Sequence, residues 1–134
     1  MTRASPRSKV LIVEDQLVIA LATEDMLVEA GYCVCGAAAD STSAVALALE
    51  KHPDIIVMDV QLARGLDGVE TALVLRGAGI TVPIVFVTAN ADEVTRQRIT
   101  GVQGASVLFK PVMPNELEAE MRRAAPQLLP SPSD

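Results

Sequence analysis

Five short apolar runs alternate with stretches of helical character along the chain. The apolar runs, rich in β-branched residues, are VLIV at 10–13, YCVCGAA from Tyr32, IIVM at 55–58, IVFV at 84–87 and SVLF at 106–109. Helix start and stop signals bound the stretches between them, which are 16–30 closed by Gly31, 41–51 opened by Ser41, 68–77 closed by Gly77, 92–100 closed by Gly101, and a last one from about Pro114 to Ala124. Apolar runs joined by crossover helices are typical of a parallel sheet covered on both faces. We therefore expect a doubly wound α/β fold with a five-stranded parallel sheet.

The chain is long enough for one domain with one hydrophobic core. It has 134 residues, of which 50% are hydrophobic, and single domains usually hold roughly 100–200 residues. We expect the globular domain to cover residues 9–125. Residues 1–8 are expected to form a flexible N-terminus, and the proline-rich residues 126–134 are expected to form a disordered tail.

Charge and hydropathy argue against two classes of partner. Eleven basic and seventeen acidic side chains give a net charge of −6, and a basic cluster occurs only near the N-terminus, so direct nucleic-acid binding is not expected. The apolar run at 10–13 stops at Glu14, short of the roughly 7–15 residues of the apolar region of a signal peptide. No run approaches the about 18 apolar residues of a membrane span. We therefore expect a cytoplasmic protein without a membrane partner.

Chemically reactive side chains stand at the ends of four of the five expected strands. Glu14 and Asp15 follow the first strand, Asp59 ends the third, Thr88 ends the fourth and Lys110 follows the fifth. In a doubly wound fold, ligands bind beyond the carboxyl ends of the strands, which meet at one edge of the sheet. We therefore expect the carboxylates, the hydroxyl and the ammonium group to share one site.

Neighbouring carboxylates repel one another unless a cation lies among them. An all-oxygen set of ligands suits Mg²⁺, which usually keeps several waters and shares its site with phosphate oxygens. This predicts that Glu14 and Asp15 hold a Mg²⁺ ion beside Asp59. A carboxylate in that place can attack phosphorus and carry the phosphoryl group as an acyl phosphate, while Thr88 and Lys110 stabilise the charge on the phosphoryl oxygens.

The chain resembles the receiver domains of bacterial two-component response regulators in five segments. They are VLIVEDQ, PDIIVMDVQL, DGVE, VPIVFVTA and LFKPV, spread from about Val10 to Met113, and the final helix extends the resemblance to Ala124. The resemblance implies the flavodoxin-like strand order 2-1-3-4-5. It also implies a domain that accepts a phosphoryl group from a phosphohistidine of a histidine kinase or of a histidine phosphotransfer protein. No enzymatic activity beyond this self-phosphorylation is expected.

The resemblance also implies a role for each site residue. Asp59 is implied as the phosphoacceptor. The implied Mg²⁺ ligands are Glu14, Asp15, Asp59 and the backbone carbonyl of Gln61. Thr88 is implied as the switch hydroxyl, and Lys110, before a cis Pro111, as the ammonium group that pairs with the phosphoryl group.

Three features depart from the family pattern. The loop after the third strand reaches Asp67 one residue later than the commonest family spacing, and Ala63 stands where proline is frequent. Val107 stands where the family usually has Tyr or Phe as a switch aromatic, three residues before Lys110. We expect Phe109 to point to the opposite face of its strand. The usual aromatic switch is therefore not expected to operate.

Only residues 112–134 follow Pro111, which is enough for one helix and a tail but not for an effector domain. We therefore expect a stand-alone receiver that acts through protein contacts. A piece cut from a longer protein has the same appearance and is the alternative.

The first helix carries two apolar stripes. The stripe expected to face the sheet consists of Ile19, Ala22, Met26, Leu27 and Ala30. A second stripe, nearly opposite, consists of Leu17, Leu21 and Val28. We interpret the second stripe as a docking surface for helices of a histidine kinase or a phosphotransfer bundle. The alternatives are a homodimer interface and exposure without a partner.

Two other functions stay open at this stage. A phosphatase of the haloacid-dehalogenase type also uses an aspartate after a parallel strand, but it needs a second acid two residues later, where this chain has Gln61. A degenerate receiver that binds a partner independently of phosphate is favoured by Val107 and disfavoured by the intact acids and lysine. A nucleotide-binding module is disfavoured because neither G-x-G-x-x-G nor G-x-x-x-x-G-K-[ST] occurs.

Overall fold

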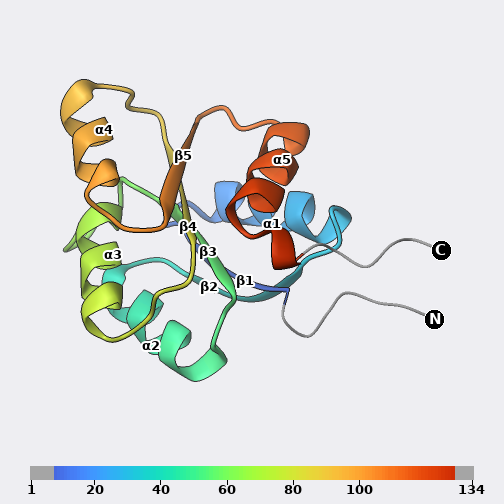
Figure 1. The fold of residues 1–134 in the computed structure, drawn as a ribbon, viewed down its shortest axis with the longest axis horizontal. Coiled ribbons are helices and arrows are strands. Elements are labelled where there is room, and N and C mark those ends of the chain that lie inside the picture. Colours follow the sequence, from blue (N-terminus) through green and yellow to red (C-terminus); the bar gives the residue numbers. More distant parts are fainter. Residues whose placement is uncertain (1–7, 129–134) are drawn as a thin grey trace.

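Strands and α-helices alternate along residues 8–128, the part of the chain that the computed structural model describes (Figure 1). The strands are β1 (Lys9–Val13), β2 (Cys33–Ala38), β3 (Ile55–Asp59), β4 (Ile84–Thr88) and β5 (Ala105–Phe109). The helices are α1 (Leu17–Glu29), α2 (Ser41–Lys51), α3 (Gly68–Gly77), α4 (Glu93–Thr100) and α5 (Pro114–Ala124), followed by a short 3₁₀-helix, η1 (Pro126–Leu128). The alternation expected from the sequence is confirmed.

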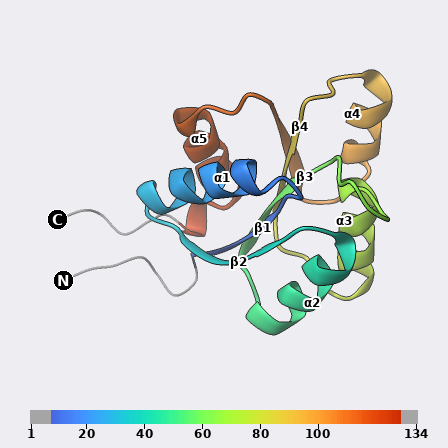
Figure 2. The same ribbon diagram turned by 180° about the vertical axis from the view of Figure 1, so that it is seen from behind.

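The strands form one sheet in the order β2-β1-β3-β4-β5, and all neighbouring pairs are parallel. Helices α1 and α5 cover one face of the sheet, and α2, α3 and α4 cover the other (Figures 1 and 2). The flavodoxin-like, doubly wound α/β fold is therefore confirmed. Among the helices of residues 8–128, none is both long and apolar enough to cross a membrane.

Alternation along the strands divides the buried side chains between two cores. In β1, Val10 and Ile12 pack on the side of α1 and α5, whereas Leu11 and Val13 pack on the side of α2, α3 and α4. Every residue of β3 is buried, because a central parallel strand has helices over both faces. The acids that follow β1 and end β3 are therefore anchored to a backbone inside the core.

Helix α1 confirms only part of its expected inner stripe. Leu27 is fully buried, and Met26 and Ala30 pack against the same core, as expected. Ala20 is buried where the stripe predicted Ala22, which is exposed. The stripe was misplaced because α1 is apolar around most of its circumference, so periodicity alone does not select the buried face.

Aspartates cap three of the helices. Asp40, Asp67 and Asp92 accept hydrogen bonds from the backbone N–H groups of Ser43, Glu70 and Thr95 at 2.9, 2.9 and 2.8 Å. Helix α2 begins at Ser41, as expected, but the cap is the preceding aspartate. Asp67 and Glu70 form a capping box that fixes the start of α3 beside the carboxyl end of β3.

The structure corrects both expected boundaries of the globular domain. Ser8 is fully buried and its carbonyl oxygen accepts a hydrogen bond from Cys33 N–H, so it belongs to the fold. The expected disordered tail begins with η1, whose Leu128 is only 2% exposed and packs into the core beneath α1 and α5. Burial of this apolar side chain favours order despite the nearby prolines. The rest of both predictions, residues 1–7 and 129–134, lies outside the described residues.

Two leucines of α1 provide a matched test of which face of this helix is buried. Leu27 is 0% exposed and Leu21 is 52% exposed. We expect Leu27→Ala to lower the free energy of unfolding by about 2–5 kcal/mol, because it leaves a cavity in the core. Leu21→Ala should lower it by less than about 1 kcal/mol. Urea denaturation measures both values, and equal losses would contradict the orientation of α1.

Candidate functional site

The predicted site residues meet at the carboxyl ends of the strands. Glu14 and Asp15 follow β1, and Asp59 ends the adjacent strand β3. One carboxylate oxygen from each of these three residues lies within 4.8 Å of the others. Lys110 follows β5, and its Nζ lies 3.0 Å from Asp59 Oδ2 and 3.5 Å from Glu14 Oε1. The sequence therefore identified an ammonium group and three carboxylates that do converge.

The carboxylate cluster has the donor chemistry of a Mg²⁺ site. Glu14 is 7% exposed and Asp59 is 4% exposed. Asp15 Oδ1 is buried and has no hydrogen-bond partner among residues 8–128, which leaves an oxygen available to a cation. Hard carboxylate oxygens of this kind are typical Mg²⁺ ligands. The residues present therefore fit the metal predicted from the sequence.

Burial and charge change the proton affinity of two groups in this cluster. Burial raises the pKa of Glu14 from 4.5 to about 7; the backbone N–H of Gln16 opposes the rise, and the negative charge of Asp59 adds to it. Burial by itself would lower the pKa of Lys110, but the hydrogen bond and charge of Asp59, together with the charge of Glu14, raise it overall. Lys110 is therefore held as a cation, whereas ionisation of Glu14 is costly.

Backbone groups position the two aspartates. Gln61 N–H donates a hydrogen bond to Asp59 Oδ1 at 3.0 Å, and Ala63 N–H donates one to Asp15 Oδ2 at 2.9 Å. A proline at position 63 would have no N–H to donate, so the alanine at this position supplies a contact that proline cannot. The sequence indicated an unusual loop here but did not predict this hydrogen bond. The role of the Gln61 carbonyl as a metal ligand stays a prediction.

Gly68 permits the close approach of α3 to the site. Its N–H donates a hydrogen bond to Val60 O at 2.6 Å, and a Cβ atom at position 68 would collide with the carbonyl oxygen of Asp59. Asp67, one residue earlier, caps α3 and also forms an ion pair with Arg98 of α4, whose Nη2 lies 2.8 Å from Asp67 Oδ2. The loop after β3 is therefore tied to both α3 and α4.

Thr88 ends β4, the strand next to β3, and its hydroxyl is directed to the loop after β4. The residue is fully buried, and its Oγ1 accepts a hydrogen bond from Asn90 N–H at 3.0 Å. Its carbonyl accepts one from Lys110 N–H at 2.9 Å, and the following Lys110–Pro111 peptide bond is cis. The cis bond that the resemblance implied is confirmed.

Phe109 corrects a prediction made from strand alternation. Val107 packs toward α2, α3 and α4, and Phe109 lies under the Arg96 guanidinium of α4, whose carbon is 4.8 Å from the ring centroid. The two residues therefore share a face, because residues two positions apart in a strand point the same way, and the expected opposite orientation is wrong. Phe109 is the cross-strand partner of Thr88. Arg96 Nε also donates to Ala91 O at 3.0 Å, so the loop after Thr88 contacts the residue that covers the ring.

Sequence comparison places these features in a known family. The response regulator receiver domain family matches residues 10–122. The transcriptional regulatory protein PdtaR of Mycobacterium tuberculosis is 36% identical over 114 residues, which cover 85% of this chain and 54% of PdtaR. The phyllosphere-induced regulator PhyR of Methylorubrum extorquens is 32% identical over 123 residues, which cover 90% of this chain and 45% of PhyR. The chain thus spans about half the length of these curated relatives.

Solved structures agree with this placement. The signal receiver domain of a modulated diguanylate cyclase from Desulfovibrio desulfuricans G20 has a TM-score of 0.79 and 38% identity, with 89% of this chain and 94% of that chain covered. The chemotaxis protein CheY4 of Vibrio cholerae has a TM-score of 0.81 and 29% identity, with 87% of this chain and 98% of the CheY4 chain covered. The fold and the acidic site define an α/β domain of the receiver type. The chain belongs to the response regulator receiver domain family.

The raised pKa of Glu14 predicts that the stability of the metal-free protein depends on pH. Because its pKa is higher in the folded state, at about 7 instead of 4.5, the folded protein binds this proton more tightly than the unfolded chain does. The free energy of unfolding should therefore fall as the pH rises through this range and stay low above it. In Glu14→Gln the fall should be smaller, by on the order of 2 kcal/mol.

Urea denaturation in EDTA, at about pH 5 and about pH 8, measures this difference. The exposed residue Glu29, changed to Gln, serves as the control and should keep the pH dependence of the unchanged protein. Replacing EDTA with Mg²⁺ should stabilise the protein more at the higher pH, because metal ligands must be deprotonated. An unchanged pH dependence in Glu14→Gln would contradict the assigned cause.

Proposed function

We propose that this receiver domain accepts a phosphoryl group on Asp59 in a Mg²⁺-dependent reaction and signals through protein contacts. The observation that carries the proposal is the position of the Lys110 ammonium, which reaches both Asp59 and Glu14 beside the unpartnered oxygen of Asp15. A buried carboxylate with a fixed cation and a cation-binding oxygen next to it is suited to receive a charged phosphoryl group. The donor is a phosphohistidine of a histidine kinase or of a histidine phosphotransfer protein.

The proposed step exchanges one bond to phosphorus for another. A carboxylate oxygen of Asp59 attacks, an O–P bond forms, and the P–N bond to the donor histidine breaks with its electron pair kept by the imidazole nitrogen. Lys110 pairs with a phosphoryl oxygen, and Thr88 donates its hydroxyl hydrogen to another. Mg²⁺, held by Glu14 and Asp15 with Asp59 and the Gln61 carbonyl, neutralises phosphoryl charge when bound. The protein is the acceptor in this reaction and is not an enzyme for other substrates.

Two alternatives are weaker. A haloacid-dehalogenase-type phosphatase needs an acid two residues after the nucleophile, but here Gln61 contributes its backbone N–H to Asp59. A phosphate-independent binding module is favoured by Val107, which lacks the ring of a switch aromatic. The contact of Phe109 with Arg96, opposite Thr88, offers a different route from the site to α4 and weakens that objection.

We propose that the protein is cytoplasmic and that the phosphoryl donor docks on the exposed side of α1. Leu17, Leu21 and Val28 are 71%, 52% and 54% exposed, so the second stripe does lie on the surface. Val18 is 79% exposed and adds to the apolar surface of this helix. Burial of this apolar surface would favour association with a partner helix.

Acetyl phosphate with Mg²⁺ should add one phosphoryl group to the protein, because a small donor needs no docking surface. The addition should be abolished in Asp59→Asn, which removes the nucleophile, and in EDTA. Asp67→Asn is the control and should keep it, because asparagine caps a helix about as well as aspartate. Intact-mass analysis gives the result, and equal loss in the two variants would rule out Asp59 as the acceptor.

The docking proposal predicts a difference between two donors. Leu17→Ala/Leu21→Ala should slow transfer from a phosphorylated histidine kinase, since each buried side chain contributes roughly 1–3 kcal/mol of apolar contact. Transfer from acetyl phosphate should be unchanged, because both side chains are exposed and neither lines the cavity beside Glu14 and Asp59. The two rates are compared for the same preparation. An unchanged kinase rate would refute docking on this stripe, and altered sedimentation with both rates unchanged would assign it to a homodimer.

A further inference from the structure

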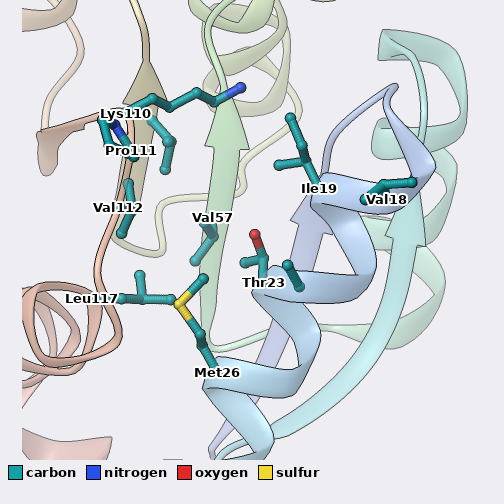
Figure 3. A pocket seen from close by; sticks show the side chains of 11 residues that line it. Val18, Ile19, Thr23, Met26, Val57, Lys110, Pro111, Val112 and Leu117 are labelled. Carbon is teal, nitrogen blue, oxygen red and sulfur yellow. The ribbon is translucent and has the colours of Figure 1, made fainter.

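A hollow of about 460 Å³ lies between α1 and α5, next to the carboxylate site (Figure 3). The sheet residues Val57 of β3 and Val87 of β4 line it, together with Lys110 and Leu117. Figure 3 shows Met26 and Leu117 approaching each other at the end away from Lys110. The volume falls in the range of roughly 300–1,000 Å³ that is typical of small-molecule sites.

Small side chains leave this space open. Ala22 and Thr23 on α1 and Val112 after β5 line the hollow, and none of them is large enough to fill it. Helices α1 and α5 pack closely elsewhere, through Leu27 and Met121, which are both fully buried in the same core. The hollow is therefore a local feature of these side chains and does not reflect loose packing of the two helices.

Only two of the side chains that line the hollow are polar, and only one of them is available to form a hydrogen bond with a ligand. The Lys110 ammonium already contacts Asp59 and Glu14. The Thr23 hydroxyl has no hydrogen-bond partner among residues 8–128, and in Figure 3 it is directed into the hollow beside Val57. The hollow thus presents apolar walls and one free hydrogen-bonding group.

Charge decides which class of molecule this space accepts. An anion would find only the Lys110 ammonium in the lining, and this group is already paired with Asp59 and Glu14, so the loss of its hydration would not be compensated. A cation would find no acidic side chain in the lining itself and would lose its hydration. We propose that the hollow is a binding site for an uncharged, mainly apolar small molecule that makes one hydrogen bond to Thr23.

The same wall connects this site to the carboxylate cluster. A second cavity, of about 20 Å³, is lined by Ile19, Thr23 and Val57 and also by Glu14 and Asp59. A molecule in the larger hollow would therefore contact side chains that also line the small cavity beside the two buried acids. Binding needs no phosphoryl group, so it is independent of the proposed function of Asp59.

Indole is a suitable probe because it is uncharged, mostly apolar and carries one N–H donor. Titration of the ¹³C-methyl-labelled protein with indole should give saturable shifts at Val57, Val87 and Val112. Indole-2-carboxylate, its anionic relative, should give much smaller shifts. Thr23→Val should weaken indole binding about two- to tenfold, as expected for loss of one hydrogen bond.

Two variants that fill the hollow, Ala22→Leu and Val112→Phe, should abolish the shifts. Ala46→Leu, an exposed alanine of α2 on the other face of the sheet, is the matched control and should bind indole normally. The proposal is overturned if indole gives no saturable shift, if the carboxylate binds equally well, or if both filled variants still bind. It is also overturned if sedimentation shows a dimer that Val112→Phe dissociates, because a second copy would then occupy the hollow.

Discussion

The Lys110 ammonium holds together acids that would otherwise oppose folding. Glu14 and Asp59 are almost fully buried, and repulsion between buried carboxylates is strong because little water screens it. Lys110 lies 3.0 Å from Asp59 and 3.5 Å from Glu14, so one cation offsets part of both charges. Burial, together with the charge of Asp59, still raises the pKa of Glu14 to about 7, so ionisation of this carboxyl group stays costly despite the nearby cation. The fold therefore tolerates an unfavourable charge arrangement at the place where the proposed function puts a divalent ion and a phosphoryl group.

The parallel sheet brings these groups within reach of one another. Neighbouring strands β1 and β3 deliver Glu14, Asp15 and Asp59 to the same edge. Lys110 follows β5, two strands from β3, and only a long side chain crosses that distance. Backbone N–H groups of the loop after β3 then orient the aspartates, with Ala63 bonded to Asp15. Fixed donors of this kind keep the carboxylates in place before any ligand arrives.

The carboxylate site has different surroundings on the two faces of the sheet. On the side of α1 and α5, the lining of the hollow shares Ile19, Thr23 and Val57 with the wall of the acid cluster. On the other side, Thr88 holds the loop after β4 through Asn90, and that loop contacts Arg96 above the ring of Phe109. The first side presents mainly apolar side chains, whereas the second consists of hydrogen bonds and the contact of Arg96 with the ring of Phe109. The carboxylate site therefore lies between an apolar surface and a polar network.

The sequence by itself determined the five strands, the helices between them and the residues delivered to the site, because apolar periodicity and turn residues are local properties of the chain. It predicted the burial of Leu27 but not that of Ala20 in place of Ala22, since α1 is apolar on most sides and tertiary contacts select the buried face. It likewise missed the burial of Leu128 and the hydrogen bond of Ala63, which depend on partners far away in the chain. A local pattern shows which side chains favour burial or charge, but tertiary contacts decide which partner each one meets.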